Sequence, residues 1–490
     1  MNFISIPFLM LFLPAAFVLH KLARPIWMKN VVLLAASLIF YACYDVKYLL
    51  FLAASIMITY FGARLGEHQK LNKKLYIYIY ILTAILNLGI LLVFKYGSFT
   101  LGNISMLLAG FGYQITVPKI LLPVGLSFFI FQSSTYILDL SFGKIKAEHN
   151  LLDYALFVSF FPTITSGPIQ RARLFLPKIK ERTMPDFTKI EEAVFVFLWG
   201  AFLKSVIADR LAVFTNAIYS DYTEYGGFLL IVCAFAYSVQ IYADFAGYSY
   251  MAIAIAKLFG FNLTENFHQP YFAKTIVEFW RRWHISLTSW FTEYLYIPLG
   301  GNRKGQIRRY LNILVVFLVS GLWHGAGWNF IVWGGIHAVY QIVGYLTKNA
   351  RAHIRSSLNI SEEKAGYQLW QRIFIFFAAS FAWIFFRAPS LTAAIAYIKN
   401  MFSVWNPWIL FDKTLFSFGL DGAEWNVLVL SLIVLVVVSY FREQGKNVLT
   451  VVGQNTLCKA FLFEILIFIL FVFGMYGDGY SASSFIYAGF

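Results

Sequence analysis

The sequence predicts an all-α, polytopic membrane protein, and its composition is the first observation that does so. Of 490 residues, 60% are hydrophobic and 13% are charged, and the mean hydropathy is +0.68. Soluble domains carry roughly 25% charged residues. Apolar runs long enough to cross a bilayer recur along the chain, and helices satisfy their backbone hydrogen bonds in lipid. We therefore expect one membrane domain over residues 1–490, with roughly 10–11 transmembrane helices plus re-entrant or interfacial helices.

Charge and cysteine usage argue against two other kinds of protein. The formal net charge of +15 could indicate a nucleic-acid partner, but an excess of Lys and Arg in cytoplasmic loops explains it better in a membrane protein. The three cysteines, Cys43, Cys233 and Cys458, are dispersed and form no CxxC pair. The sequence therefore predicts neither a disulfide framework nor a thiolate metal site.

Loop charges orient the first five predicted spans. The apolar segment 3–19 has no basic stretch before it and no small-residue cleavage site after it, so we interpret it as a retained span with its N-terminus outside. A second span ends near Tyr44, and three more cover about 48–65, 76–94 and 119–140. The loops predicted to be cytoplasmic hold the basic residues Lys21, Arg24, Lys29, Lys70, Lys73, Lys74, Lys144 and Lys146.

Up to this point the predicted loops alternate between the two sides of the membrane, and this alternation fails at the apolar segment 151–168. Basic residues follow this segment as well as precede it, so both flanks are predicted to be cytoplasmic. Pro162, Gly167 and Pro168 would also break a spanning helix. A re-entrant or interfacial element is expected here, because irregular backbone at membrane depth must be buried in protein or line a cavity.

The second half of the chain contains a predicted hairpin. A span at 193–214 leads to an acidic loop, and 227–259 returns. The flanking stretches 274–309 and 348–372 are both basic, so 311–346 must enter and leave the membrane on the cytoplasmic side or consist of two elements. Three later spans are expected at about 370–386, 427–441 and 461–473.

His324 lies at the turn of this hairpin. Gly321, Gly325 and Gly327 surround it and would interrupt a helix. At 1.5 Å per residue, about thirteen residues place the turn roughly 20 Å deep. An ionisable group at membrane depth is a functional-site candidate, and histidine is the side chain whose ordinary pKa suits proton transfer near neutral pH.

The segment 278–295 is predicted to form one amphipathic helix at the cytoplasmic interface. Its apolar face consists of Trp280, Trp283, Leu287, Trp290, Phe291 and Tyr294. His284 falls at the edge of this face, on the side of Arg281. The spacing alone favours a surface anchor with an incidental histidine. The alternative is that Arg281 and Arg282 face a phosphate-bearing donor, with His284 beside its path.

A polar stripe runs along the apolar helix expected at 236–251. Gln240, Asp244 and Tyr248 recur every four positions and so share one face. A carboxylate buried in a membrane protein needs a partner. An interhelical hydrogen bond and the orientation of a catalytic histidine are equally compatible with this pattern.

No metal site is predicted. The chain has no HExxH motif and no clustered cysteine–histidine set. His324 and His337 are thirteen positions apart, so on a continuous helix they would point in different directions. We interpret His268 and His337 as structural. The chain also has no Walker lysine loop, GxGxxG or GxSxG motif.

Two blocks of sequence carry a family resemblance. The first comprises Tyr242-Ala-Asp-Phe-Ala-Gly-Tyr-Ser, Glu265-Asn-Phe-His-Gln-Pro-Tyr, Glu278-Phe-Trp-Arg-Arg-Trp-His-Ile-Ser-Leu and Tyr294-Leu-Tyr-Ile-Pro-Leu-Gly-Gly-Asn-Arg. The second is Gly321-Leu-Trp-His-Gly, and weaker echoes include the terminal Phe485-Ile-Tyr-Ala-Gly-Phe. Together they resemble the membrane-bound O-acyltransferase (MBOAT) family, in particular its bacterial alginate O-acetyltransferase-like branch. The similarity spans most of the chain and is densest in a core of about 230–346.

The resemblance implies an enzyme and assigns roles to the two histidines. It implies an O-acyltransferase in which His324 is the invariant histidine deep in a central tunnel. His284 matches a second histidine or asparagine on a cytoplasmic-side helix, which moves its interpretation from incidental to functional.

The expected donor substrate is acetyl-CoA or another acyl thioester, such as an acyl carrier protein, with no cofactor. Arg281 and Arg282 are then expected to hold donor phosphates, and Trp283 and Trp323 to shape the tunnel. The donor-side residues also include Gln240, Asp244 and Asn329.

The resemblance also implies partners and a location. Acetyl groups would pass across the bacterial cytoplasmic membrane, within its lipids, to an extracytoplasmic SGNH-hydrolase-like transferase that modifies a cell-surface polysaccharide such as alginate, peptidoglycan or cellulose. D-alanyl transfer in teichoic acid synthesis is the alternative within the family. A proton-coupled transporter and a non-enzymatic scaffold are alternatives outside it.

Overall fold

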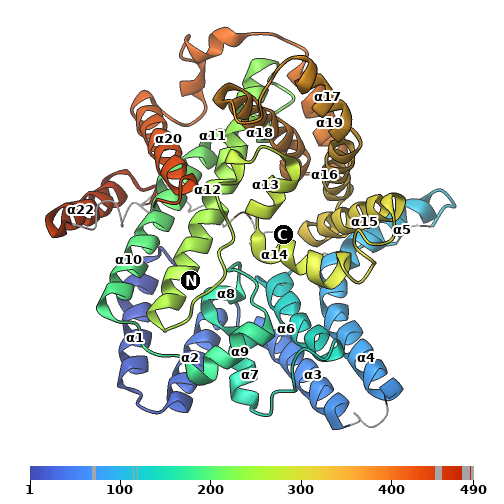
Figure 1. Ribbon diagram of the computed structural model, residues 1–490, viewed down its shortest axis with the longest axis vertical. Coiled ribbons are helices and arrows are strands. Elements are labelled where there is room, and N and C mark those ends of the chain that lie inside the picture. The colour runs from blue at the N-terminus through green and yellow to red at the C-terminus, as the bar shows by residue number, and fades with distance from the viewer. Residues whose placement is uncertain (69–72, 114, 119, 447–454, 477–485, 487–490) are drawn as a thin grey trace. The chain divides into compact units, whose positions relative to one another are not determined.

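The structure is a computed structural model that describes residues 1–68, 73–113, 115–118, 120–446, 455–476 and 486. These residues form helices, turns and irregular segments, without a strand among them (Figure 1), and this confirms the predicted all-α class. Three sequence predictions fall partly outside the described residues. They concern the basic loop residue Lys70, the span start at Lys119, and all of the terminal motif 485–490 except Ile486.

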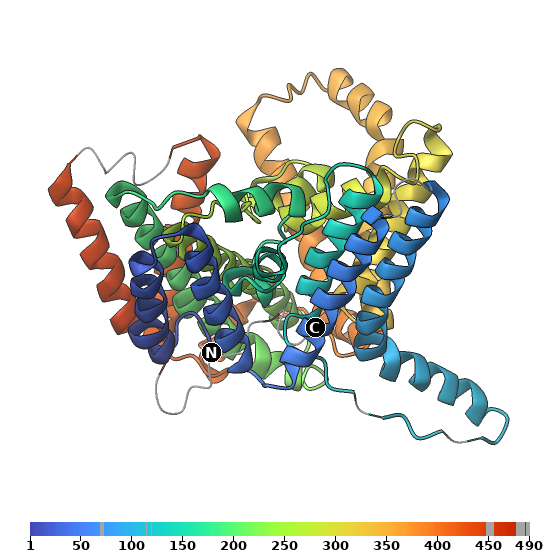
Figure 2. The same ribbon diagram turned by 90° about the horizontal axis from the view of Figure 1, so that it is seen from below.

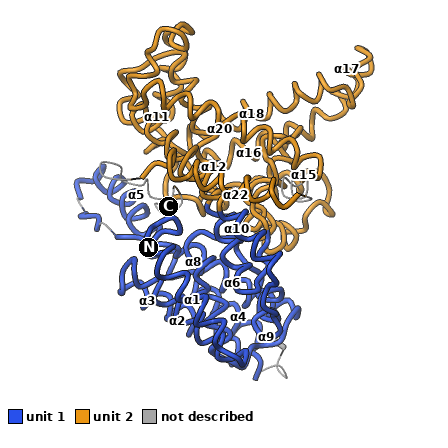
Figure 3. The backbone as a smooth tube through the Cα atoms, turned by 90° about the vertical axis from the view of Figure 1, so that its left-hand side faces the viewer, with its two compact units in different colours: residues 1–197, 248–264, 487–490 blue, residues 198–247, 265–486 orange. Residues whose placement is uncertain are grey.

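The chain divides into two compact units (Figure 3). Unit 1 comprises residues 1–197, 248–264 and 487–490, and unit 2 comprises residues 198–247 and 265–486. All of the predicted site residues belong to unit 2. The long helix α12 (Phe228–Leu258) contributes residues to both units.

Unit 1 is built from short and medium-length helices that are rich in apolar residues. They are η1 (Phe8–Phe12), α1 (Leu13–Leu22), α2 (Ile26–Ala42), α3 (Tyr48–His68), α4 (Lys73–Leu91), η2 (Leu92–Tyr96), α5 (Gly97–Ala109), α6 (Leu126–Ser141), α7 (Leu151–Ser159), α8 (Phe161–Ile164), α9 (Ala172–Glu181) and the first part of α10 (Phe187–Phe202).

Helices α3, α4 and α6 lie side by side in unit 1 (Figure 2). Ser55 Oγ donates to Asn87 Oδ1 at 2.7 Å, and Asn87 Nδ2 donates to Ser133 Oγ at 3.0 Å. Small polar side chains let helices approach closely and satisfy one another where no water is present.

Unit 2 contains most of the 31-residue helix α12. Its elements are the end of α10, η3 (Leu203–Ala208), α11 (Asp209–Ser220), most of α12, η4 (Pro270–Phe272), α13 (Ile276–Arg282), α14 (Ile285–Phe291), η5 (Thr292–Tyr296), α15 (Gln306–His324), α16 (Trp328–Leu346), α17 (Lys348–Ser357), α18 (Ala365–Arg387), α19 (Leu391–Met401), η6 (Pro407–Leu410), η7 (Thr414–Ser417), α20 (Gly422–Glu443) and α22 (Thr456–Phe473).

Six helical stretches among the described residues are long and apolar enough to cross a membrane, or seven if α16 and α17, bent by 53°, form one span. They are α3, the stretch Lys74–Ala109, α12, α18, α20 and α22. The polytopic class is thereby confirmed. Two other predicted spans correspond to shorter apolar helices, Phe8–Leu22 and Ile26–Ala42.

The predicted hairpin is present, with its turn at the predicted place. Helix α15 ends at His324, Gly325–Gly327 form the turn, and α16 begins at Trp328. The two helices meet at glycines: a Cβ on Gly321 would lie 2.2 Å from the carbonyl oxygen of Phe330, and one on Gly334 would lie 2.2 Å from that of Phe317. This close approach requires small residues, as in membrane helix pairs generally.

The predicted break within 151–168 is also present. Helix α7 ends at Ser159, Phe160 is not helical, and the short helix α8 follows with Pro162 in its first turn. Residues 160–170 are all buried. Burial in protein is what irregular backbone at membrane depth requires, and the re-entrant character itself stays a prediction.

The prediction of a single amphipathic helix over 278–295 is wrong. The structure divides it into α13 and α14, and the following turn is the π-helical η5. Trp283 is extended between the two α-helices, and His284 has left-handed backbone angles. Side-chain periodicity could not reveal this break, because the backbone groups that stabilise it come from a separate segment.

Candidate active site

His324 is buried among aromatic rings at the end of α15, with 2% of its surface exposed. The ring centroids of Trp323 and Trp333 each lie 4.9 Å from that of His324, and the Phe386 centroid lies 5.3 Å away. All three rings present an edge-on geometry, which suits the quadrupoles of aromatic side chains. This aromatic shell fixes the imidazole in an apolar surrounding.

His284 lies at the break between α13 and α14, where its φ is 43° and its ψ is 53°. The segment before α13 satisfies the backbone groups at this break. The N–H of His268 donates to the carbonyl of Arg282 at 3.0 Å, and the N–H of Ile285 donates to the carbonyl of Asn266 at 2.9 Å. The sequence block 265–271 therefore holds His284 in a left-handed conformation that histidine adopts uncommonly.

Trp323 lies close to both histidines. Its ring centroid is 6.0 Å from that of His284 and 4.9 Å from that of His324. Phe245 of α12 packs edge-on against His284 at 4.6 Å. Burial lowers the pKa of His284 to about 3, because an apolar surrounding disfavours the charged imidazolium. His284 is therefore neutral at physiological pH.

Asp244, one member of the polar stripe of α12, belongs to a buried network of charges. Asp244 Oδ1 lies 2.6 Å from Lys204 Nζ, and Asp244 Oδ2 accepts a hydrogen bond from the N–H of Ile486 at 2.9 Å. Lys204 Nζ also donates to Asp209 Oδ1 at 2.8 Å. Gln240 accepts from the Thr215 hydroxyl at 2.6 Å. Both oxygens of Asp244 thus have partners that are not histidines, which favours the interhelical role over the orientation of a catalytic histidine.

Lys204 and Asp209 form a buried ion pair that was not among the residues predicted from the sequence. Both are buried in unit 2, with side chains 2% and 0% exposed. The signal was present, because two opposite charges five positions apart inside a predicted span are costly in lipid unless they are paired.

The two neighbouring arginines have different surroundings. Arg282 is tied to two carboxylates, with Nη2 2.6 Å from Glu278 and Nη1 2.5 Å from Glu443. Arg281 is exposed and lines a pocket with a cavity volume of about 240 Å³. Arg281 is therefore placed where it can contact a bound donor, whereas Arg282 is engaged in ion pairs.

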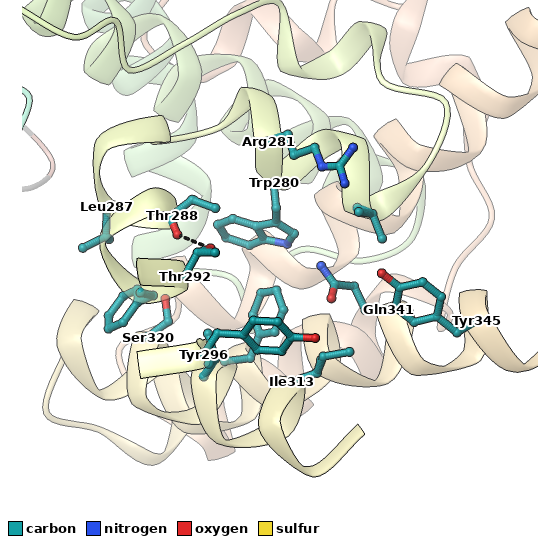
Figure 4. Close-up of a pocket in the computed structure, with 14 residues that line it drawn as sticks. Trp280, Arg281, Leu287, Thr288, Thr292, Tyr296, Ile313, Ser320, Gln341 and Tyr345 are labelled. Atoms are coloured by element: carbon teal, nitrogen blue, oxygen red, sulfur yellow. Dashed lines mark hydrogen bonds between the residues drawn. The ribbon is translucent and has the colours of Figure 1, made fainter. Parts of the chain in front are cut away.

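This pocket, which we call the α13–α16 pocket, is mainly apolar inside. Its walls come from α13, α14, η5, α15 and α16 (Figure 4). Polar atoms enter it from Arg281, Thr288, Thr292, Tyr296, Ser320, Gln341 and Tyr345. Ser320 lies one helical turn before His324, and Leu287 lies three residues after His284. The pocket thus ends near both histidines, which no sequence pattern indicated.

Trp283 and Asn329 have mainly packing roles in the structure. Trp283 stacks on Phe279 at 5.5 Å and contacts Trp383 at 4.9 Å. The Asn329 amide donates to the carbonyls of Phe385 at 3.2 Å and Ala388 at 3.0 Å, which ties the start of α16 to the end of α18. Their predicted contact with a donor stays a prediction.

The fold and the site define a class of protein: a multi-pass α-helical membrane protein with two buried histidines beside an apolar pocket. The chain belongs to the membrane-bound O-acyltransferase (MBOAT) family, whose sequence pattern matches residues 140–388. It is therefore an acyltransferase, and the predicted family is confirmed. The matched range contains the predicted core and both histidines.

Three relatives place the chain within this family. It is 37% identical over 416 residues to the probable alginate O-acetylase AlgI of Azotobacter vinelandii, covering 84% of this chain and 80% of that protein. It is 35% identical over 428 residues to the peptidoglycan O-acetyltransferase of Helicobacter pylori, covering 81% and 77%. Against the teichoic acid D-alanyltransferase of Streptococcus thermophilus it is 27% identical over 260 residues, covering 50% and 60%.

Proposed function

We propose that this protein transfers an acetyl group from a cytoplasmic thioester toward an extracytoplasmic polysaccharide hydroxyl. The observation that carries the proposal is the α13–α16 pocket, which has Arg281 in its wall and ends one helical turn from the buried His324. The names of the relatives support acetyl as the acyl group, because those with 35–37% identity are alginate and peptidoglycan O-acetyltransferases. The D-alanyltransferases are more distant.

His324 acts as the general base in this proposal. It takes the proton from the acceptor hydroxyl as the hydroxyl oxygen attacks the thioester carbonyl, and the departing thiolate then receives a proton. A transient acyl-histidine is the second route, in which the imidazole nitrogen attacks first and the acceptor oxygen displaces it. The aromatic shell supports either route, because edge-on rings hold the imidazole in one place, where its nitrogen can accept a proton or attack a carbonyl carbon.

The donor is proposed to be acetyl-CoA. An apolar pocket with a guanidinium in its wall suits a pantetheine arm attached to phosphates. Arg281 is the proposed phosphate contact. His284 is proposed to lie beside the thioester path, since Leu287, in the helix that His284 begins, lines the same pocket.

The acetyl group is proposed to leave the membrane with the help of a second protein. An SGNH-hydrolase-like transferase on the extracytoplasmic side would carry it to alginate, peptidoglycan or a similar polymer. The positive-inside pattern supports a location in the bacterial cytoplasmic membrane, with the basic loops on the donor side.

The test uses the purified protein in detergent with [¹⁴C]acetyl-CoA, together with a purified SGNH-hydrolase-like transferase and the polymer. The proposal expects label on the polymer that depends on this chain. Proteoliposomes containing the protein then separate the rival classes. Uptake of an ion or solute without labelled polymer would indicate a transporter. Normal labelling of the polymer by the His324→Ala variant would indicate a non-enzymatic scaffold.

A further inference from the structure

The α13–α16 pocket points toward His324 but ends before reaching it. On α15, the lining residues Ile313, Phe317 and Ser320 are spaced by four and three positions and share one helix face. His324 is the next position on that face, four residues beyond Ser320, and it is not among the lining residues. Something therefore occupies the space between the end of the pocket and His324.

The facing wall on α16 shows which side chains fill this space. Tyr345 and Gln341 line the pocket and lie four positions apart. The next positions on the same face are His337 and Trp333, both 0% exposed. The Trp333 ring centroid lies 4.9 Å from that of His324. The α16 face therefore runs from the pocket to His324. Its half nearer to His324, with His337 and Trp333, is shielded from the pocket.

Trp280 of α13 provides the cover. Its indole lines the pocket, and Figure 4 shows it at the centre of the view, between Ser320 and Thr288 on one side and Gln341 and Tyr345 on the other. Its ring centroid lies 4.8 Å from His337 and 5.7 Å from Trp333, nearly perpendicular to the first. The indole thus separates the pocket from the two α16 rings behind it.

His337 holds the indole in this position. The indole N–H of Trp280 donates to His337 Nδ1 at 3.3 Å. Because Nδ1 accepts this bond, the neutral imidazole carries its proton on Nε2, which has no hydrogen-bond partner among the described residues. The hydrogen bond from Trp280 therefore explains why a histidine occupies this buried position on α16.

We propose that Trp280, held by His337, is a positioning residue that controls access from the α13–α16 pocket to His324. With the indole in place, the pocket is closed at Ser320. When the indole moves aside, a thioester carbonyl can advance along the α15 face to His324. The same cover keeps pocket water from the thioester, where water would attack the carbonyl and release acetate and free thiol. The thioester part of this inference rests on the proposed function, and the closure itself does not.

Cysteine labelling tests the closure without any acyl transfer. The exposed cysteines are removed as Cys43→Ser and Cys458→Ser, and a single probe is introduced as His324→Cys or Ser320→Cys. Inverted membrane vesicles are treated with a charged methanethiosulfonate reagent, and the labelled fraction is followed by mass spectrometry. The Ser320→Cys probe lines the pocket and should react whether or not Trp280 is present.

The inference expects Trp280→Leu to increase the labelling rate of the His324→Cys probe by about tenfold, because the covered population becomes open. His337→Phe, which removes the acceptor but keeps a ring, should give a smaller increase. Trp290→Leu is the matched control, since Trp290 is a buried tryptophan of α14 that does not line the pocket. Equal labelling of His324→Cys with and without the indole, or an equal increase with Trp290→Leu, would overturn the inference.

Donor turnover separates this inference from the proposed function. In the proposed reaction, Trp280→Leu should raise the ratio of acetyl-CoA hydrolysis to polymer acetylation, whereas a purely structural defect would lower both rates together. If the unaltered protein acetylates nothing, the proposed function fails while the labelling still decides the closure. If the unaltered protein acetylates polymer but Trp280→Leu does not change the ratio of hydrolysis to acetylation, the proposed function stands and the role of Trp280 in the reaction is refuted.

Discussion

Two groups of polar side chains are buried in unit 2, and they are held in opposite ways. Lys204 lies between Asp209 at 2.8 Å and Asp244 at 2.6 Å, so charge is balanced against charge. His284 and His324 instead lie among the rings of Phe245, Trp323, Trp333 and Phe386.

The difference separates a structural cluster from a chemical one. Burial of a charged group is tolerated when an opposite charge lies in contact, and removing one partner leaves the other uncompensated. A neutral imidazole among rings needs no counter-charge, so its nitrogens can serve proton transfer. Loss of a residue from the ion cluster should therefore reduce stability, and loss of His324 should reduce activity. Variants of the two groups can distinguish these roles.

The largest expected effect is on catalysis by His324. His324→Ala should lower polymer acetylation by about 10³-fold, equivalent to about 4 kcal/mol, because the proton acceptor is lost. Initial rates with labelled acetyl-CoA provide the measurement. The amount of protein in the membrane should be unchanged. The control is His268→Ala, whose side chain is exposed and should be dispensable. A residual rate near that of the unaltered enzyme would place His324 with the structural cluster.

The next effect concerns the ion cluster. Lys204→Met should destabilise the protein by about 3–5 kcal/mol, because Asp209 and Asp244 lose their shared cation in a buried site. Thermal unfolding in detergent, followed by size-exclusion chromatography, measures this loss. Lys257→Met is the matched control at a more exposed pair with Glu192 and should cost at most about 1 kcal/mol. Equal losses in the two variants would contradict the division.

A smaller effect follows from the lowered pKa of His284. Its pKa is about 3 in the folded protein, against an ordinary value of 6.5 for an exposed histidine, so below pH 6.5 the unfolded chain gains a proton that the folded chain does not. At pH 5 this amounts to about 2 kcal/mol of lost stability. His284→Asn removes the titrating group and suits the left-handed backbone. Between pH 7.5 and pH 5, the melting temperature should fall less for the variant than for the unaltered protein. Equal falls in the two proteins would refute the assignment of the lowered pKa to His284.

The smallest effect distinguishes the two arginines. Arg281→Gln should raise the KM for acetyl-CoA by about tenfold, or about 1.4 kcal/mol, with little change in thermal stability, because a phosphate contact is lost. Arg282→Gln should instead lower stability, since it breaks the ion pairs with Glu278 and Glu443. Steady-state kinetics and melting temperatures on both variants give the comparison. A KM effect confined to Arg282→Gln would reverse the assignment.

The hairpin illustrates how much a local pattern can predict. The basic flanks and the glycines around His324 predicted a turn there, and the turn is at Gly325–Gly327. The break at His284 was missed for a physical reason. Its backbone groups are satisfied by Asn266 and His268 of a preceding segment, while the side-chain pattern of 278–295 has an uninterrupted helical period. Such long-range hydrogen bonds leave no trace in periodicity.

Taken alone, the sequence determined the all-α membrane class, the hairpin that ends at His324 and the MBOAT family, because composition, loop charge and motif order are properties of the chain itself. Only the tertiary structure decided which polar groups meet. It paired Asp244 with Lys204, tied Arg282 to Glu443 and left Arg281 on a pocket wall. It also placed Trp280 against His337. These partners lie on different helices, and the helix packing that brings them together is not encoded in any one segment.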